Sequence, residues 1–162
     1  QKTAYEIRNC DWSSDVCSSD LSCRFYDGLL GLRLGSDGIN SGPTQDALDG
    51  LADTRVRITS HRCSCGPGIE CLDYQPPNRG RPMPRDLSAA DRAHWQIRLA
   101  VDNLEEIAAR LAHGGGRVLG DGSVLGDGIV TLSAPEATAL GFWRGLQVAD
   151  PDGHRLQLVE TC

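Results

Sequence analysis

The stretch from 94 to 117, "HWQIRLAVDNLEEIAARLAHGGGR", sets a strand pattern directly before a helix pattern and decides the fold. Apolar and polar residues alternate at its start, which predicts a half-buried strand over 94–101. The apolar members are Trp95, Ile97, Leu99 and Val101. Asp102 is then expected to cap a helix, because Glu105 follows three residues later as in a capping box.

The predicted helix carries one apolar stripe, formed by Leu104, Ile107, Ala108 and Leu111. The glycines at 114–116 are expected to end it. A short strand is predicted at 117–120 and a flexible Gly/Asp loop at 120–128. Two further strands, 142–150 and 154–160, are joined by the turn signal Pro-Asp-Gly. The second half of the chain therefore predicts the order β-α-β-β-β.

The first half predicts the same unit without its opening strand. A short helix is expected at 23–30 because its apolar residues share one face and Gly31 follows. The later elements are a strand beginning within 33–36, a loop at 37–45, one or two helical turns at 44–51, and strands at 54–62 and 69–75. A Pro-rich segment at 76–93 is interpreted as a linker.

Residues 1–21 differ in character from the rest of the chain. Their sequence includes "DWSSDVCSSDL", has no hydrophobic period and contains Lys2, whereas no Lys occurs from Ser22 onward. Translated back into codons, the segment resembles a short-read sequencing adapter. We interpret it as non-native and leave it out of the fold prediction. The expected organisation is then an adapter-like segment 1–21, a truncated first module 22–75, a linker 76–93 and a second module 94–162.

Composition narrows the classes of partner. The chain has a formal net charge of −6, and its Arg residues are scattered. This pattern predicts no nucleic-acid footprint, which needs a basic stripe. There is no long apolar run, so no membrane span is predicted, and a cytoplasmic location is expected.

The cysteines from Ser22 onward are odd in number and irregularly spaced, which does not favour a disulfide framework. One cluster, His61, Cys63, Cys65 and Cys71, raises the question of a zinc site. Structural zinc sites usually contain paired C-x₂₋₄-C units. Reduced cysteines that serve as small strand hydrophobes are the alternative interpretation.

Four segments together resemble the vicinal-oxygen-chelate superfamily, which includes glyoxalase I, methylmalonyl-CoA epimerase, extradiol dioxygenases and bleomycin-resistance proteins. They are "FYDGLLGLRLG", "GIECLDY", "IRLAVDNLEEIAARLAHGGGR" and "VADPDGHRLQLVE". The resemblance implies an α+β fold of two βαβββ modules whose sheets curl into a cleft. Many members hold one divalent metal there, as a Lewis acid with open positions. Zn, Ni, Fe or Mn is the cofactor that this implies, and many relatives pair as homodimers.

The resemblance implies one metal ligand from the first and last strand of each module. The first of these would lie upstream of Ser22, and Glu70 in "IECLDY" fits the second. Glu70 is alternatively a solvated, outward-facing carboxylate. The third position is Gln96 where the family usually has His, with His94 two residues earlier on the same face. The last is Gln157 where the family has Glu, and Glu160 lies three residues further on.

Amide oxygens are weak ligands for these metals, and Gln cannot act as a carboxylate base. Glu70, Gln96, Arg98 and Gln157 are therefore expected to form a hydrogen-bonding floor for a small organic ligand. The alternative function is a divalent-metal-dependent lyase, isomerase or dioxygenase that uses Glu70, His94 or Gln96, and Gln157 or Glu160. A non-functional truncated fragment is the third hypothesis. The sequence identifies no catalytic residue and no substrate.

Overall fold

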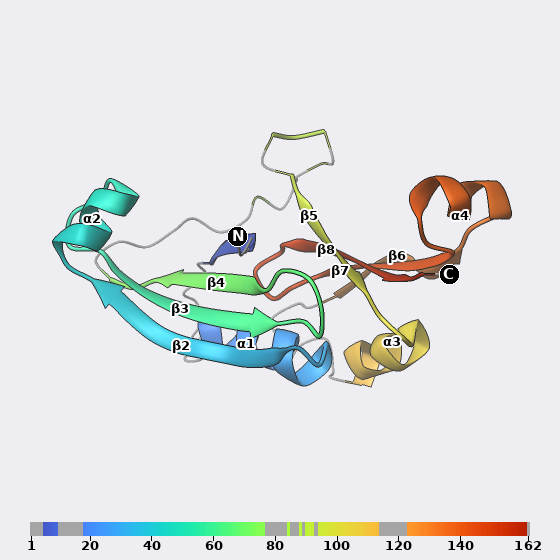
Figure 1. Cartoon of the computed structure of the whole chain (residues 1–162), viewed down its shortest axis with the longest axis horizontal. Coiled ribbons are helices and arrows are strands. Elements are labelled where there is room, and N and C mark those ends of the chain that lie inside the picture. Colours follow the sequence, from blue (N-terminus) through green and yellow to red (C-terminus); the bar gives the residue numbers. More distant parts are fainter. Residues whose placement is uncertain are drawn as a thin grey trace. The chain divides into compact units, whose positions relative to one another are not determined.

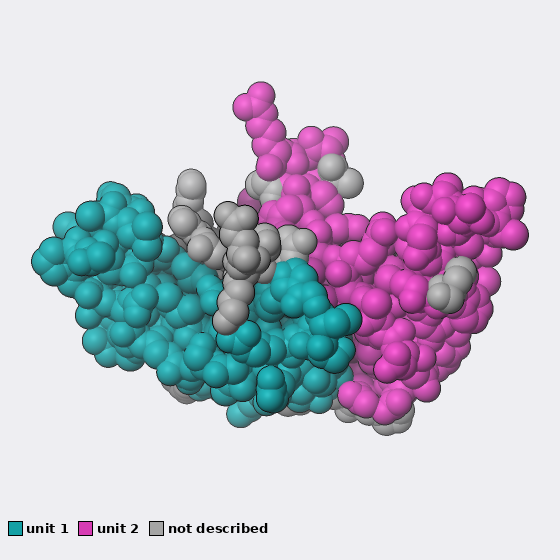
Figure 2. All heavy atoms as spheres, viewed as in Figure 1, with its two compact units in different colours: residues 1–82 teal, residues 83–162 magenta. Residues whose placement is uncertain are grey.

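The computed structural model describes residues 5–9, 18–76, 84, 88, 90–92, 94–113 and 123–161. The chain divides into two compact units, residues 1–82 and 83–162 (Figure 2). The boundary between them lies within the Pro-rich segment 76–93.

The second unit contains one four-stranded sheet with two helices (Figure 1). Its elements are β5 (Gln96–Ala100), α3 (Leu104–His113), β6 (Ser123–Thr131), α4 (Ala134–Leu140), β7 (Arg144–Ala149) and β8 (Arg155–Glu160). The strand order is β5-β8-β7-β6. The first strand, β5, runs parallel to β8, while the other neighbouring strands are antiparallel.

The first unit repeats this topology with the strand order β1-β4-β3-β2. Its elements are β1 (Tyr5–Asn9), α1 (Ser18–Cys23), the π-helix η1 (Arg24–Leu29), β2 (Arg33–Ser41), α2 (Pro43–Asp49), β3 (Arg55–Arg62) and β4 (Ile69–Tyr74). The expected α+β architecture of two βαβββ modules is confirmed. In both modules a short helix, α2 or α4, is inserted between the second and third strands.

Each module buries a helix against its sheet. In the second unit the predicted stripe of α3 is confirmed, because Leu104, Ile107 and Leu111 are buried. The sheet side of this core includes Leu146, Val148, Leu156 and Leu158. In the first unit the fully buried Phe25 and Tyr26 come from η1, and the Tyr26 ring lies 5.3 Å from the ring of His61 on β3.

The opening strand of the first module differs from the expectation. We predicted that this strand is missing, but Tyr5–Asn9 forms β1 and pairs in parallel with β4. These residues lie in the adapter-like segment that the sequence analysis leaves out. A physical reason is that strand pairing uses main-chain N–H and C=O groups, so an open sheet edge accepts an extended segment of almost any sequence.

Two predicted loops are wrong. The segment 37–45 was expected to be a loop, but β2 runs to Ser41 and pairs with β3 along its whole length. The segment 120–128 was also expected to be a loop, but β6 begins at Ser123. In β2, cross-strand pairing outweighs the low strand propensity of Gly, Asn and Asp. Strand β6 pairs with β7 at 123–125 and 130–131, with an irregularity between these two stretches. The predicted strand at 117–120 and the glycines at 114–116 lie outside the described residues.

The helix caps also correct the sequence analysis. The N-cap of α3 is Asn103, whose Oδ1 accepts the N–H of Glu106 at 3.0 Å, and not Asp102. Helix α4 was not predicted at all. Its signal was present, since Ser133 and Glu136 form a capping box with Pro135 in the first turn.

Candidate functional site

The open face of the second sheet is the face opposite α3. Helix α3 lies on the side of Glu160, because the Glu160 carboxylate accepts the N–H of Leu104. Side chains alternate along a strand, and residues paired across neighbouring strands share a face. The register pairs Gln96 with Arg155, Arg98 with Gln157, and Gln157 with Gln147. The open face therefore carries Gln96, Arg98, Gln147, Arg155 and Gln157.

Arg98 and Gln157 form the central contact of this face. The Nε–H of Arg98 donates to Oε1 of Gln157 at 2.8 Å, and Nη1 donates to the main-chain carbonyl of Leu140 at 3.1 Å. Leu140 is the last residue of α4, whose final carbonyls have no partner within the helix. A cation there is also favoured by the helix dipole.

An aromatic ring holds the guanidinium from one side. The Cζ atom of Arg98 lies 4.9 Å from the centre of the buried Phe142 ring. Phe142 can lie there because the neighbouring strand residue is Gly145: a Cβ at Gly145 would meet Cε2 of Phe142 at 3.1 Å. The glycine therefore makes room for the ring that supports Arg98.

This geometry makes the second-module positions a poor fit for a metal ion. An Arg has only donors, so the Arg98 contact fixes Gln157 with its oxygen toward the guanidinium and its NH₂ group turned away. One lone pair of that oxygen is used by Arg98, and a positive charge lies beside it. A divalent cation on the other lone pair would be repelled by the Arg98 guanidinium.

The other candidates on β5 lie near this contact. Gln96 is exposed on the strand and lies opposite Arg155. His94 precedes the strand and is half-buried, and its Nδ1 is buried without a hydrogen-bond partner among the described residues. Sequence reasoning did not single out Arg155 or Gln147 for this face. The strand alternation of "RGLQVAD" and "HRLQLVE" could have identified both.

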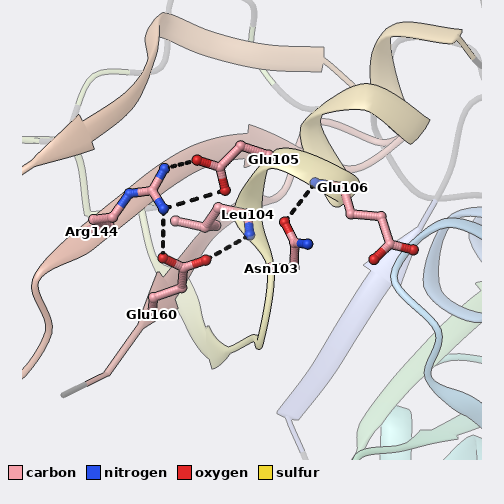
Figure 3. Close-up of polar contacts among 6 residues, drawn as sticks. All are labelled: Asn103, Leu104, Glu105, Glu106, Arg144 and Glu160. Atoms are coloured by element: carbon pink, nitrogen blue, oxygen red, sulfur yellow. Dashed lines mark hydrogen bonds and ion pairs between the residues drawn. The ribbon is translucent and has the colours of Figure 1, made fainter.

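The role of Glu160 in the structure differs from the metal-ligand role considered from the sequence. Its Oε1 accepts the N–H of Leu104 at 2.9 Å, and its Oε2 pairs with Nη1 of Arg144 at 2.9 Å (Figure 3). Arg144 also pairs with Glu105 of α3. The hydrogen bond from Arg144 holds the pKa of the Glu105 carboxyl below its usual value. Both oxygens of Glu160 are therefore used in attaching α3 to the sheet, on the face away from Gln157.

A polar hollow of about 460 Å³ lies beside this network. Its lining consists of Val101, Asp102, Asn103, Glu105, Trp143, Arg144, Glu160 and Thr161. The Arg144 charge is already balanced there by two carboxylates. Three of the lining side chains, Glu105, Arg144 and Glu160, therefore already serve to attach α3 to the sheet.

Glu70 lies on the corresponding strand of the first sheet. It is half-buried on β4 and pairs in register with Ser60 of β3. Its neighbour Cys71 pairs with Thr59, which contacts Cys23 at the start of η1, so Cys71 is on the helix side. Glu70 is therefore on the opposite face of its own sheet, which it shares with the buried cluster of Val56, Leu72 and Tyr74.

The sequence cluster around Cys63 is spread out in the structure. His61 and Cys71 are buried within the strands, whereas Cys65 is exposed in the turn between them. Burial lowers the pKa of His61 and raises that of Cys63. Within the described part of the chain, no three His, Cys, Asp or Glu side chains are grouped so that they could hold one metal ion.

The fold and this face define a protein class of two βαβββ modules with a polar open sheet face. The family sequence model of the Glyoxalase/Bleomycin resistance protein/Dioxygenase superfamily matches residues 16–158. The chain therefore belongs to that superfamily. No curated protein matches the chain at a significant level.

Solved structures with the same fold come from several functional groups. A glyoxalase family protein from Bacillus cereus is 17% identical, with a TM-score of 0.73 over 98% of this chain and 91% of that one. The trypanothione-dependent glyoxalase I of Leishmania major is 17% identical, with a TM-score of 0.53 over 99% and 86%. An antibiotic binding protein from a Streptomyces species is 17% identical, with a TM-score of 0.53 over 100% and 96%. At these identities the likeness establishes the fold alone.

Among the described helices, none combines the length and the apolar character that crossing a membrane requires.

Proposed function

We propose that this chain binds a small organic molecule on the open face of its second sheet, and that no metal ion takes part there. The hydrogen bond from Arg98 Nε to Gln157 Oε1 carries the proposal. It places a guanidinium, which would repel a metal ion, on the Gln157 oxygen and leaves the amide NH₂ group to donate to a ligand. A binding site needs a small number of such directional polar groups.

The same fold is used for small-molecule recognition elsewhere. A Streptomyces relative of this fold is described as an antibiotic binding protein. This supports a binding role for the present chain but does not indicate its ligand.

The alternative function is a metal-dependent lyase, isomerase or dioxygenase. It is favoured by Glu70, a half-buried carboxylate on the face of the first sheet opposite η1. In that case Glu70 would be a ligand, and the remaining ligands would come from residues other than Gln157 and Glu160, whose oxygens are engaged.

The test is a saturation-transfer NMR screen of the full chain against small aromatic acids, amides and alcohols, with a metal chelator present. We expect some of these compounds to bind with the chelator present. The backbone amides that they shift should belong to β5, β7 and β8. Binding that occurs only after a divalent metal is added would overturn the proposal and favour the enzyme.

A further inference from the structure

We infer that the ligand of the second sheet carries a planar oxyanion, a carboxylate, which Arg98 and Gln157 receive together. The inference rests on the proposed function and adds the chemical class of the ligand. It follows from which hydrogen-bonding groups of the two side chains are already used.

Only donors remain at the Arg98–Gln157 contact. Arg98 uses Nε on Gln157 and Nη1 on Leu140, and its Nη2 has no partner among the described residues. The NH₂ group of Gln157 is likewise without a partner there. Guanidinium and amide N–H donors on two side chains in direct contact match the two oxygens of a carboxylate.

The charge of this face has the sign that such a ligand needs. Arg98 and Arg155 make no ion pair with any described residue, and the other three side chains of the face are neutral amides. Elsewhere in the same unit, Arg110 and Arg144 are paired with carboxylates. The two arginines of the open face therefore keep a positive charge that an anionic ligand would balance.

Arg98 is also held in place before any ligand arrives. The contacts with Gln157, Leu140 and the Phe142 ring fix its guanidinium from three directions. Less side-chain entropy is then lost on binding, which favours affinity. The buried Phe142 ring thus supports the guanidinium from within the protein and leaves its remaining donors for the ligand.

The experiment compares 2-naphthoate with 2-naphthamide, which have the same ring but differ in charge and in acceptor oxygens. The full chain is titrated with each at millimolar concentration in low salt with a chelator, and Arg Nε–H and backbone amide signals are followed by NMR. We expect naphthoate to shift Arg98 Nε–H and the amides of β5 and β8. Naphthamide should bind at least about tenfold more weakly, and added sodium chloride should weaken naphthoate binding.

Three variants sharpen the comparison. Arg98→Gln should weaken naphthoate binding roughly tenfold to a hundredfold, as expected for the loss of a charged hydrogen bond. Arg98→Lys keeps the charge but loses the planar fork, so an intermediate loss is expected and the test stands even if Arg98→Gln folds poorly. Arg110→Gln, on the exposed side of α3, is the matched control and should bind like the unaltered chain.

The possible outcomes distinguish a failure of this inference from a failure of the proposed function. Equal binding of naphthamide and naphthoate on this face, unaffected by Arg98→Gln, would overturn the inference and leave the proposed function standing. Naphthoate shifts confined to other parts of the chain would also overturn the inference. If neither probe shifts the amides of β5, β7 or β8, the inference and the proposed function fail together.

Discussion

At the scale of single residues, Gly145 is small for a reason that can be tested. A Cβ at this position would lie 3.1 Å from the Phe142 ring and 3.7 Å from the carbonyl oxygen of Leu158. The ring that supports Arg98 would then have to shift. Overpacking of this kind typically costs about 1–3 kcal/mol.

Gly145→Ala is therefore expected to lower the free energy of unfolding by about 1–3 kcal/mol, measured by chemical denaturation. It should also weaken naphthoate binding, because Phe142 would move away from Arg98. Gly28→Ala is the control, since nothing lies within 4 Å of a Cβ there. An equal loss in both variants would contradict the account of Gly145.

His61 gives a pH prediction at the same scale. The ring is fully buried on β3, and burial lowers its pKa, with a smaller opposing effect from the Asp27 carboxylate. The unfolded chain, with a His pKa near 6.5, therefore takes up a proton more readily than the folded chain. The stability that the buried, neutral His61 contributes is therefore fully present above about pH 6.5, and it is lost as the pH falls below that value.

His61→Phe keeps a ring beside Tyr26 and removes the titration. We expect the free energy of unfolding of this variant to fall less between neutral pH and pH 5 than that of the unaltered chain, in urea denaturation at a series of pH values. All other titrating groups are shared, so the difference reports on His61. Parallel curves for the two proteins would show that the ring is not responsible.

At the scale of elements, the two candidate caps of α3 can be separated by mutation. The sequence predicts Asp102, but the structure assigns the cap to Asn103. Asn103→Ala should cost about 1 kcal/mol of stability, whereas Asp102→Ala, at an exposed position, should stay within about 0.5 kcal/mol. Thermal or chemical unfolding of both variants gives the comparison. The reverse order would support the cap that the sequence predicts.

Helix α3 and strands β3, β5 and β8 could be read from the sequence, whereas helix α4 and the full extent of the edge strands β1, β2 and β6 could not. The stripe from Leu104 to Leu111 and the alternation of β3, β5 and β8 are local patterns, and they gave the correct elements. Strands β2 and β6 contain Gly and Asp, and they become strands by pairing with neighbours distant in the sequence. The Asp37 carboxylate is bound by the Arg57 guanidinium of β3, a contact that no local pattern indicates.

The candidate site was predictable in part for the same reason. Gln96 and Gln157 were identified from the ligand positions of the family that the chain resembles, and Arg98 from its place on the same strand face as Gln96. The bond between Arg98 and Gln157 could not be predicted, because it depends on the parallel register of β5 and β8. The use of Glu160 in attaching α3 also depends on packing, since its partners Leu104 and Arg144 lie far away in the chain.

At the scale of the whole molecule, β1 tests the role of the first residues. It pairs with β4 at the edge of the first sheet, and its removal would expose β4 as an open edge. A chain without residues 1–9 is therefore expected to associate more strongly with rising concentration than the full chain, as measured by analytical ultracentrifugation. Identical sedimentation of the two chains would indicate that β4 does not need this cover.

The central claim is that the second module recognises its ligand through Arg98 and Gln157 without a metal ion. The most direct measurement is a calorimetric titration of Mn²⁺, which prefers oxygen ligands, into the full chain and into Gln157→Ala. The account predicts the same heats for both chains, with no stoichiometric binding that depends on Gln157. One Mn²⁺ bound per full chain, and lost in Gln157→Ala, would contradict it.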